Sequence, residues 1–158
     1  PIAYFVSFRT YGTWLHGDTR GSFDRHSNVF GEAAIPVNPF WQGFEANRLR
    51  FPPVKLSSNR RKATRLAIEE TCAIRGWSLH AVNIRTNHAH TVVTAPTSAA
   101  LVLNAFKANA TRVMRLAGFW SRAGSPWSTG GSTRYLWTDW EMGRAICYVE
   151  HRQGPALD

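Results

Sequence analysis

Residues 77–95 read WSLHAVNIRTNHAHTVVTA and contain two short runs of strand-forming residues. Val, Ile, Thr and aromatic side chains are frequent in both runs, and Thr86-Asn87 between them suits a tight turn. Pro96 ends the second run, because a proline cannot donate to a ladder of backbone hydrogen bonds. The stretch therefore predicts two neighbouring antiparallel strands joined by a short turn.

A helix is expected on each side of this strand pair. Residues 57–77 read SSNRRKATRLAIEETCAIRGW, with Ser57 or Ser58 as the N-cap and Gly76 as the stop. After the strand pair, TSAALVLNAFKANATRVMRLAG predicts a second amphipathic helix that ends at Gly118. The apolar stripes expected on the two helices are Ala63, Leu66, Ala67 and Ile74 on the first, and Val102, Ala105, Phe106, Val113 and Leu116 on the second.

The N-terminal third predicts one strand followed by a long insertion. Residues 2–12, IAYFVSFRTYG, are dense in aromatic and β-branched residues and stop at Gly12. Residues 16–55 carry many Gly and Pro residues, and a loop of this length inside a compact domain is uncommon and usually functional. We expect a single domain over residues 1–158, with residues 16–55 as a loop insertion.

The C-terminal third predicts a hairpin and a helix. Residues 125–138, SPWSTGGSTRYLWT, suit a hairpin about Gly130-Gly131, and Asp139 is the expected N-cap of a helix over residues 140–153. The order of elements is then that of a split βαβ, ferredoxin-like α+β fold. We expect an antiparallel sheet with helices on one face and an added C-terminal helix.

Composition indicates a packed protein with a polyanionic partner. Nineteen Lys and Arg residues against ten Asp and Glu residues give a formal net charge of +9. Such an excess favours nucleic acid over a membrane surface, because no long apolar run is present. An ordinary basic protein is the alternative. Cys72 and Cys147 form no CxxC pair, so we expect buried thiols and a reduced, cytoplasmic setting.

His88 and His90 are two apart in the second strand of the pair and therefore point to the same face of the sheet. Two imidazoles suit a divalent metal, but an accidental pair on a polar face is the simpler alternative. The last helix offers further groups, because Tyr148 and His151 share one of its faces. Glu150 and Gln153 are oxygen donors nearby, and an opposing stripe of Met142, Ile146 and Val149 would hold the helix on the sheet.

A metal beside a tyrosine suits phosphodiester cleavage. The cation stabilises charge that develops on the phosphoryl oxygens, and the phenol can attack phosphorus to form a covalent intermediate. Because that intermediate retains the energy of the broken bond, rejoining a strand needs no nucleotide cofactor. A half-buried packing role is the alternative for Tyr148.

Three stretches resemble the single-tyrosine transposases that carry the HUH motif (His, hydrophobic, His), including REP-associated tyrosine transposases. TNHAHTVV is similar to their metal-bearing strand, AICYVEHRQG to the helix with the lone tyrosine, and YFVSFRTYGTWLHG to their first strand and loop. The resemblance implies a ferredoxin-like fold. It also implies cleavage of single-stranded DNA beside imperfect hairpins, through a 5′-phosphotyrosine intermediate that leaves a free 3′ hydroxyl.

Carried over to this sequence, the resemblance makes Tyr148 the nucleophile and His88 and His90 ligands of Mg²⁺ or Mn²⁺. The third ligand of the family lies about one helical turn after the tyrosine, where this chain has Arg152, which cannot bind a cation. We expect His151 to replace it, with Gln153 second if the helix end unwinds. Relatives often form homodimers, and a homodimer is possible here.

Cations and aromatic residues outside this centre are candidates for DNA contacts. The cations are Arg60, Arg61, Lys62, Arg65, Lys107, Arg112 and Arg115, for which solvated helix faces are the alternative. The aromatic residues are Trp41, Trp120, Trp127, Trp137 and Trp140, most of which are expected to pack in the core or a lid.

The functional hypothesis has two competitors. The chain could be a domesticated hairpin-binding protein that has lost catalysis, in which case a chelator would not affect DNA binding. It could also be a phosphoesterase that uses water, in which case the tyrosine would be dispensable. His16 could contact DNA or the leaving group, His80 is expected on a sheet face, Tyr135 is expected to pack, and no role is expected for His26.

Overall fold

The structure is a computed structural model that describes residues 1–13 and 49–158. Most of the expected loop over residues 16–55 lies outside the described residues, and so do His16, His26 and Trp41. The described elements, in chain order, are β1 (Ala3–Arg9), α2 (Ser58–Arg75), β2 (Ser78–Ile84), β3 (His88–Thr94), α3 (Ala99–Leu116), β4 (Ser132–Leu136) and α4 (Asp139–His151).

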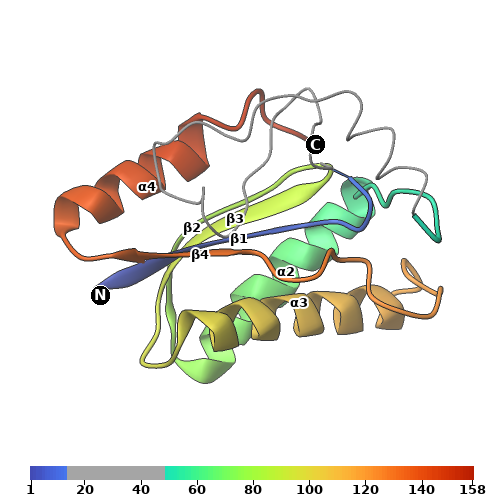
Figure 1. The fold of residues 1–158 in the computed structure, drawn as a ribbon, viewed down its shortest axis with the longest axis horizontal. Coiled ribbons are helices and arrows are strands. Elements are labelled where there is room, and N and C mark those ends of the chain that lie inside the picture. The colour runs from blue at the N-terminus through green and yellow to red at the C-terminus, as the bar shows by residue number, and fades with distance from the viewer. Residues whose placement is uncertain (14–48) are drawn as a thin grey trace.

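The strands form a 4-stranded antiparallel sheet in the order β2-β3-β1-β4. Helices α2 and α3 cover one face of the sheet, and α4 lies against the other (Figure 1). This is the predicted α+β, ferredoxin-like arrangement with an added C-terminal helix. The prediction of the fold class is therefore confirmed.

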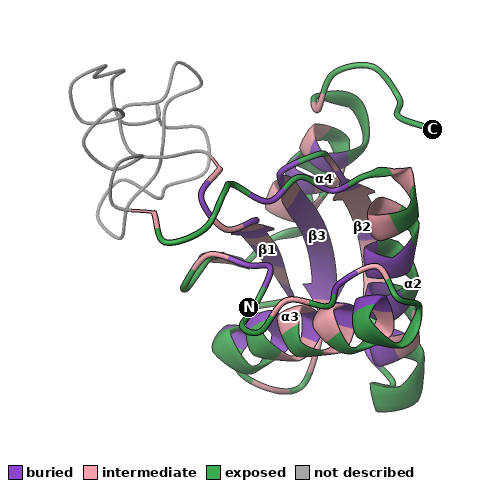
Figure 2. Cartoon of the chain, turned by 90° about the vertical axis from the view of Figure 1, so that its right-hand side faces the viewer, coloured by how far each residue is buried: buried purple, intermediate pink, exposed green. Residues whose placement is uncertain are grey.

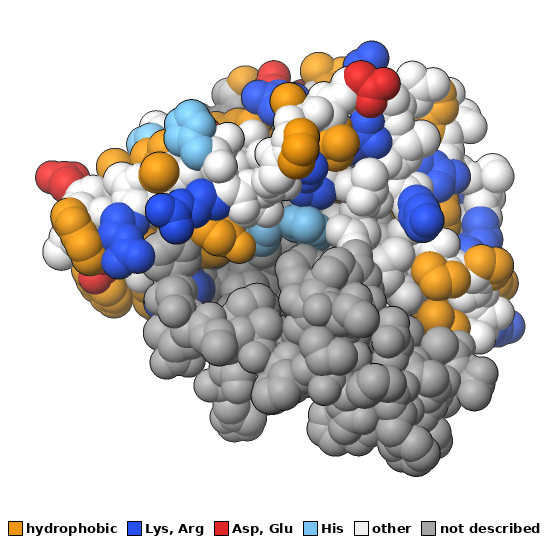
Figure 3. Space-filling view, turned by 90° about the horizontal axis from the view of Figure 1, so that it is seen from above, with side chains coloured by type: hydrophobic (Ala, Val, Ile, Leu, Met, Phe, Trp, Pro, Cys, Tyr) orange, Lys and Arg blue, Asp and Glu red, His pale blue; other side chains and the backbone are white. Residues whose placement is uncertain are grey.

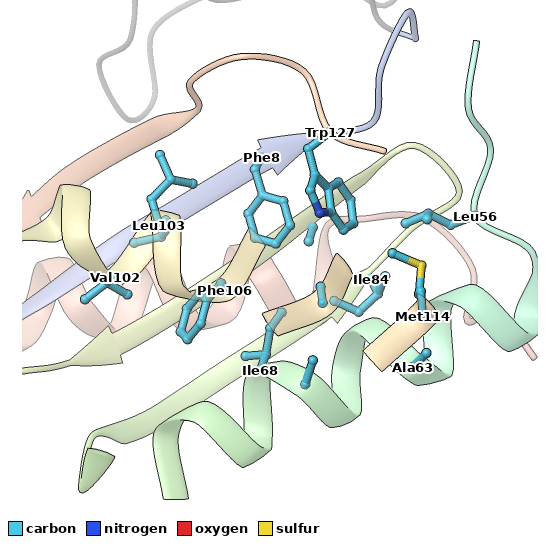
Figure 4. Close-up of a cluster of buried hydrophobic side chains, with 14 of the residues drawn as sticks. Phe8, Leu56, Ala63, Ile68, Ile84, Val102, Leu103, Phe106, Met114 and Trp127 are labelled. Carbon is cyan, nitrogen blue, oxygen red and sulfur yellow. The ribbon is translucent and has the colours of Figure 1, made fainter. Parts of the chain in front are cut away.

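The main core lies between the sheet and the pair α2 and α3, and Figure 2 shows buried residues on the sides of the elements that face each other. Phe8 from β1, Ile68 from α2 and Phe106 from α3 are fully buried at its centre (Figure 4). A smaller cluster on the opposite face joins the sheet to α4, and its buried members are Ala3, Phe5, Ala81, Val92, Leu136, Ala145 and Val149. The two clusters give the sheet a structural layer on each side, so α4 is held in a defined place.

The helix ends follow the predicted caps closely. The Ser57 side chain accepts a hydrogen bond from the backbone N–H of Arg60, and Gly76 ends α2 in the left-handed conformation (φ 70°) that favours glycine. Ser98 caps α3 in the same way as Ser57 caps α2. For α4 the cap is Thr138, one residue before the predicted Asp139, because its hydroxyl accepts from the N–H of Glu141.

The prediction that Leu66 and Ile74 belong to the buried stripe of α2 is wrong, because Leu66 is 56% exposed and Ile74 is 77% exposed. The helix instead buries Thr64 and Thr71 beside Ile68. Both threonine hydroxyls donate to the carbonyl four residues earlier, at 2.8 Å and 2.7 Å, so their burial leaves no hydroxyl unsatisfied. On α3, the predicted core residue Leu116 is likewise exposed, and Met114 is buried instead.

The predicted hairpin over residues 125–138 is also wrong. The chain on both sides of Gly130-Gly131 pairs with β1 and its continuation: Trp127 bridges Thr10, and Ser132 pairs with Ser7. A side chain at Gly131 would lie 2.7 Å from the carbonyl oxygen of Ser7, so glycine permits this close approach. The segment therefore extends along one strand and does not turn back on itself.

The two thiols differ in exposure. Cys72 is buried in the main core, and burial raises its pKa to about 11, whereas Cys147 is exposed on α4. The expectation of two buried thiols is thus wrong for Cys147. Among the described residues, no helix combines the length and the apolarity that crossing a bilayer requires.

Removing one methylene from a core position of α2 tests this packing. Ile68→Val is expected to lower the free energy of unfolding by about 1 kcal/mol, because it leaves a small cavity. Ile74→Val removes the same group from an exposed site of the same helix, and its expected effect is below about 0.5 kcal/mol. Urea denaturation of both variants measures the difference, and equal effects would contradict the orientation of α2.

Candidate metal and nucleophile centre

The two imidazoles of β3 lie together on the face of the sheet that α4 covers. Their ring centroids are 4.7 Å apart, and Ala89 between them is fully buried on the opposite face. Alternation along the strand therefore places both histidines on one face, as expected from the sequence. Figure 3 shows this face, with imidazole side chains on it and Lys and Arg side chains around them.

His90 has one ring nitrogen hydrogen-bonded and the other unused. Its Nδ1 bonds to the hydroxyl of Ser7, its register partner on β1, while its Nε2 is buried and has no hydrogen-bond partner among the described residues. Burial, with a smaller contribution from His88, holds the pKa of His90 well below its ordinary value of 6.5. The ring is therefore neutral at pH 7, as a metal ligand must be.

His88 is oriented by the residue before it. Its Nδ1 lies 2.6 Å from Oδ1 of Asn87, and its Nε2 lies 3.3 Å from Oε1 of Gln153. Both amide oxygens accept, so a ring nitrogen of His88 that carries a proton donates to the amide beside it. The Gln153 amide is oriented in turn by its own N–H, which donates to the carbonyl of Tyr148 at 3.3 Å.

The Nε2 of His88 and the Oε1 of Gln153 lie within hydrogen-bond distance, and either a proton or a metal cation between them can join the two atoms. Together with the buried Nε2 of His90, they form a set of two imidazole nitrogens and one amide oxygen. Such a mixed N and O set suits a divalent cation.

Tyr148 extends from α4 onto this centre. Its ring centroid lies 5.7 Å from that of His90 and 5.9 Å from that of Phe5. The helix is held there by the buried side chains of Ala145 and Val149, and by a hydrogen bond of 2.9 Å from the Asn83 amide to the carbonyl of Val149. The phenol and both imidazoles therefore meet within one chain.

The structure separates the two predicted third ligands. Helix α4 ends at His151, and the side chain of His151 is 71% exposed and lies 3.7 Å from Glu150. Within residues 1–13 and 49–158, no three His, Cys, Asp or Glu side chains gather as a metal site, so His151 does not join the imidazole pair. Gln153 reaches the imidazole pair because the chain leaves the helical conformation at Arg152 (φ −121°).

The cations predicted to contact DNA lie on α2 and α3, away from this centre, and most are occupied by neighbouring groups. Arg65 and Arg112 form ion pairs with Glu69 and Glu70, and Arg61 pairs with Asp158. Arg60, Lys107 and Arg115 donate to backbone carbonyls. Lys62 is exposed and has no side-chain partner in the part of the chain that the structure describes.

The other singled-out residues take varied positions. Trp120 and Trp127 are buried, whereas Trp137 and Trp140 are exposed and remain available to stack on bases. His80 lies on β2 and hydrogen-bonds to Thr94 at 2.8 Å, as expected of a sheet residue. Tyr135 is half exposed at the edge strand β4, so the expectation that it packs is only partly met.

Sequence reasoning missed several polar neighbours of the centre. Ser7 and Asn83 are the register partners of His90, and Arg9 is the register partner of His88. Burial lowers the pKa of Arg9, which lies on the same face as Ser7. Alternation along each strand could have placed these residues on one face, but only the pairing register brings them beside the histidines.

Comparison with known proteins adds evidence from structure alone, since no protein-family model and no curated protein matches the chain. A REP-associated tyrosine transposase bound to a REP hairpin superposes with a TM-score of 0.51 at 11% identity, over 93% of this chain and 63% of that chain. A protein from Deinococcus radiodurans R1 that is assigned as a transposase superposes with a TM-score of 0.52 at 11% identity, over 97% of this chain and 92% of that chain. The fold is that of these transposases.

The resemblance to single-tyrosine transposases is thereby confirmed at the level of the fold. The chain spans less than two thirds of the length of the hairpin-bound transposase. At 11% identity the likeness concerns the architecture, so the chemistry has to be argued from the side chains of this chain.

Proposed function

We propose that the protein is a metal-dependent single-stranded DNA endonuclease and strand transferase that cuts beside DNA hairpins. The observation that carries this proposal is the convergence of Tyr148 with His90 and His88 inside one chain. A phenol beside two imidazoles has the groups that covalent phosphodiester cleavage requires. The transposase fold of the chain supports the same reaction class.

The cation would be held by Nε2 of His88, Nε2 of His90 and Oε1 of Gln153. The buried Nε2 of His90, which has no partner among the described residues, and the approach of the Gln153 amide oxygen to His88 support this choice of ligands. When bound, Mg²⁺ or Mn²⁺ supplies positive charge that stabilises the charge developing on the phosphoryl oxygens. Ser7 and Asn87 orient the two rings through their Nδ1 atoms.

Tyr148 is the nucleophile in this proposal. Its phenol oxygen forms a bond to phosphorus while the bond from phosphorus to the 3′ oxygen breaks. The phenolic proton passes to solvent, and the 3′ oxygen takes up a proton. The products are a 5′-phosphotyrosine and a free 3′ hydroxyl, and attack by another 3′ hydroxyl reverses the step and joins a new strand.

Hairpin DNA is the proposed substrate for two reasons. The net charge of +9 favours a polyanion, and one of the structural neighbours is bound to a REP hairpin. Arg9 lies opposite His88 on β1, on the face that carries the centre, where a guanidinium can contact a backbone phosphate.

Covalent attachment to DNA tests the proposal. The protein is incubated with synthetic hairpins that carry single-stranded extensions, and the products are separated on a denaturing gel. We expect a slower-migrating protein–DNA adduct with Mg²⁺ or Mn²⁺ and none with EDTA. Tight hairpin binding with no adduct under either condition would contradict the enzyme and favour the hairpin-binding alternative.

A further inference from the structure

A second basic site lies outside the candidate centre, in a cavity of about 390 Å³. Its walls come from the segment before α2, from Arg60 on α2, and from the turn that follows α3. Among the described residues that line it, three are cations, namely Lys55, Arg60 and Arg122, and none is Asp or Glu. Unbalanced positive charge around a hollow of this kind favours an anionic ligand.

Within the described part of the chain, Arg122 is held in place by aromatic rings and not by an acid. Its guanidinium lies 4.3 Å from the ring centroid of Phe51, 4.7 Å from that of Trp120 and 5.5 Å from that of Tyr11. Its Nε is buried without a hydrogen-bond partner, and no ion pair of Arg122 is found within the described residues. Stacking therefore orders the group while its N–H donors stay available for a ligand.

The other two cations complete the site. Arg60 stacks on Trp120 at 5.5 Å and donates to the carbonyls of Phe119 and Lys55, so its charge is fixed at the wall. The side chain of Lys55 is exposed and has no partner in the part of the chain that the structure describes. The positive end of the α2 dipole lies beside them, because α2 begins at Ser58 and has no acidic residue in its first turn.

The cavity is at the same end of the sheet as the metal and nucleophile centre. The segment that leads into α2 hydrogen-bonds to the carbonyl of Tyr11, just beyond β1, and to that of Thr86, just before β3. The start of β3, the start of α2 and the ends of α3 and α4 lie together at this end (Figure 1). One DNA molecule that crosses this end can therefore contact both sites.

We propose that this cavity binds a backbone phosphate of the hairpin stem, and so positions the adjoining single strand at Tyr148. The proposal rests on the proposed function, because a DNA substrate is what brings phosphates to both sites. A guanidinium with ordered, available donors matches a phosphate in charge and geometry. Contacts of this kind fix the position of DNA without reading its sequence.

Salt-dependent binding tests the assignment. The probe is a synthetic DNA hairpin with a single-stranded extension, and binding is measured in EDTA so that cleavage does not intervene. Lys55→Gln and Arg122→Gln are each expected to weaken binding several-fold. They are also expected to lower the slope of log Kd against log[NaCl] by about 1, the value for one lost phosphate contact.

Arg75→Gln is the matched control. It removes the same charge from the opposite end of α2, roughly 27 Å away by the rise of an 18-residue helix, and from an arginine that also stacks on a tryptophan. Its salt slope is expected to equal that of the parent protein. Thermal unfolding checks that Arg122→Gln folds. Lys55→Gln is not expected to affect folding, because the Lys55 side chain is exposed.

The outcomes separate the cavity from the proposed function. If the parent protein binds the hairpin and both cavity variants match Arg75→Gln, the cavity assignment is overturned and the proposed function stands. If equal losses occur on a single-stranded oligonucleotide of the same length, the assignment to the stem is overturned. If the parent protein shows no salt-dependent binding, both proposals fall.

Discussion

Tyr148→Phe is expected to abolish the covalent linkage to DNA while hairpin binding is retained. The substitution removes only the phenolic oxygen, and the ring keeps its contacts with Phe5 and His90. Loss of a nucleophile costs far more than loss of a binding contact, so the rate of adduct formation should fall by at least about 10³-fold. A denaturing gel with labelled hairpin DNA measures the rate.

Tyr135→Phe is the matched control for this experiment. Tyr135 is half exposed on β4 and contacts Tyr4 and Trp137, and no ring contact joins it to His88 or His90. Its adduct rate should equal that of the parent protein. An adduct that persists in Tyr148→Phe and disappears in Tyr135→Phe would transfer the nucleophile to β4.

Metal affinity is expected to depend on His88 and Gln153 and not on His151. His88→Ala removes a nitrogen ligand and should weaken Mn²⁺ binding by at least about 100-fold. Mutation of a residue that only orients a ligand already lowers metal affinity by about 10- to 100-fold, and loss of the ligand itself should cost more. Gln153→Ala removes the amide oxygen that faces His88 and should cost about 10-fold. Calorimetry or electron paramagnetic resonance of Mn²⁺ measures both affinities.

His151→Ala distinguishes the two third ligands. The His151 side chain is exposed and does not join the imidazole pair, so this variant should bind Mn²⁺ as the parent protein does. A loss of affinity in His151→Ala with none in Gln153→Ala would reverse the assignment. It would mean that the helix continues past His151 when the metal binds.

The sequence predicted the elements and the face of the histidines well, because these depend on local chemistry. Capping by Ser57 and the stop at Gly76 follow from backbone groups within one helical turn. The shared face of His88 and His90 follows from the alternation of a strand. Each of these features needs only the residues next to it.

Features that depend on distant parts of the chain could not be predicted. Ser7 meets His90 only through the register of β1 with β3, which residue types do not specify. Leu66 was expected inside because it is apolar, but the packing of α2 places Thr71 there, with its hydroxyl satisfied within the helix. Gln153 reaches His88 because α4 ends at His151, and helix ends are the least certain feature of a sequence pattern.

The excess of cations is visible in the sequence, but the partners of each cation are not. Arg112 on α3 was expected to contact phosphate, yet it pairs with Glu70 on α2, a contact that only the packing of the two helices creates. Arg122 was not among the predicted DNA contacts, because the rings that hold it come from separate segments of the chain. Tertiary structure thus decides which cations remain available for DNA.

Identifying the residue that becomes linked to DNA tests directly whether Tyr148 is the nucleophile. The adduct is digested with nuclease and trypsin and analysed by mass spectrometry. Cleavage after Arg144 and Arg152 gives a peptide over residues 145–152, in which Tyr148 is the only tyrosine. We expect a 5′-phosphonucleotide on this peptide, formed only when divalent metal is present. A nucleotide on the peptide over residues 135–144, or an adduct that forms in EDTA, would contradict this expectation.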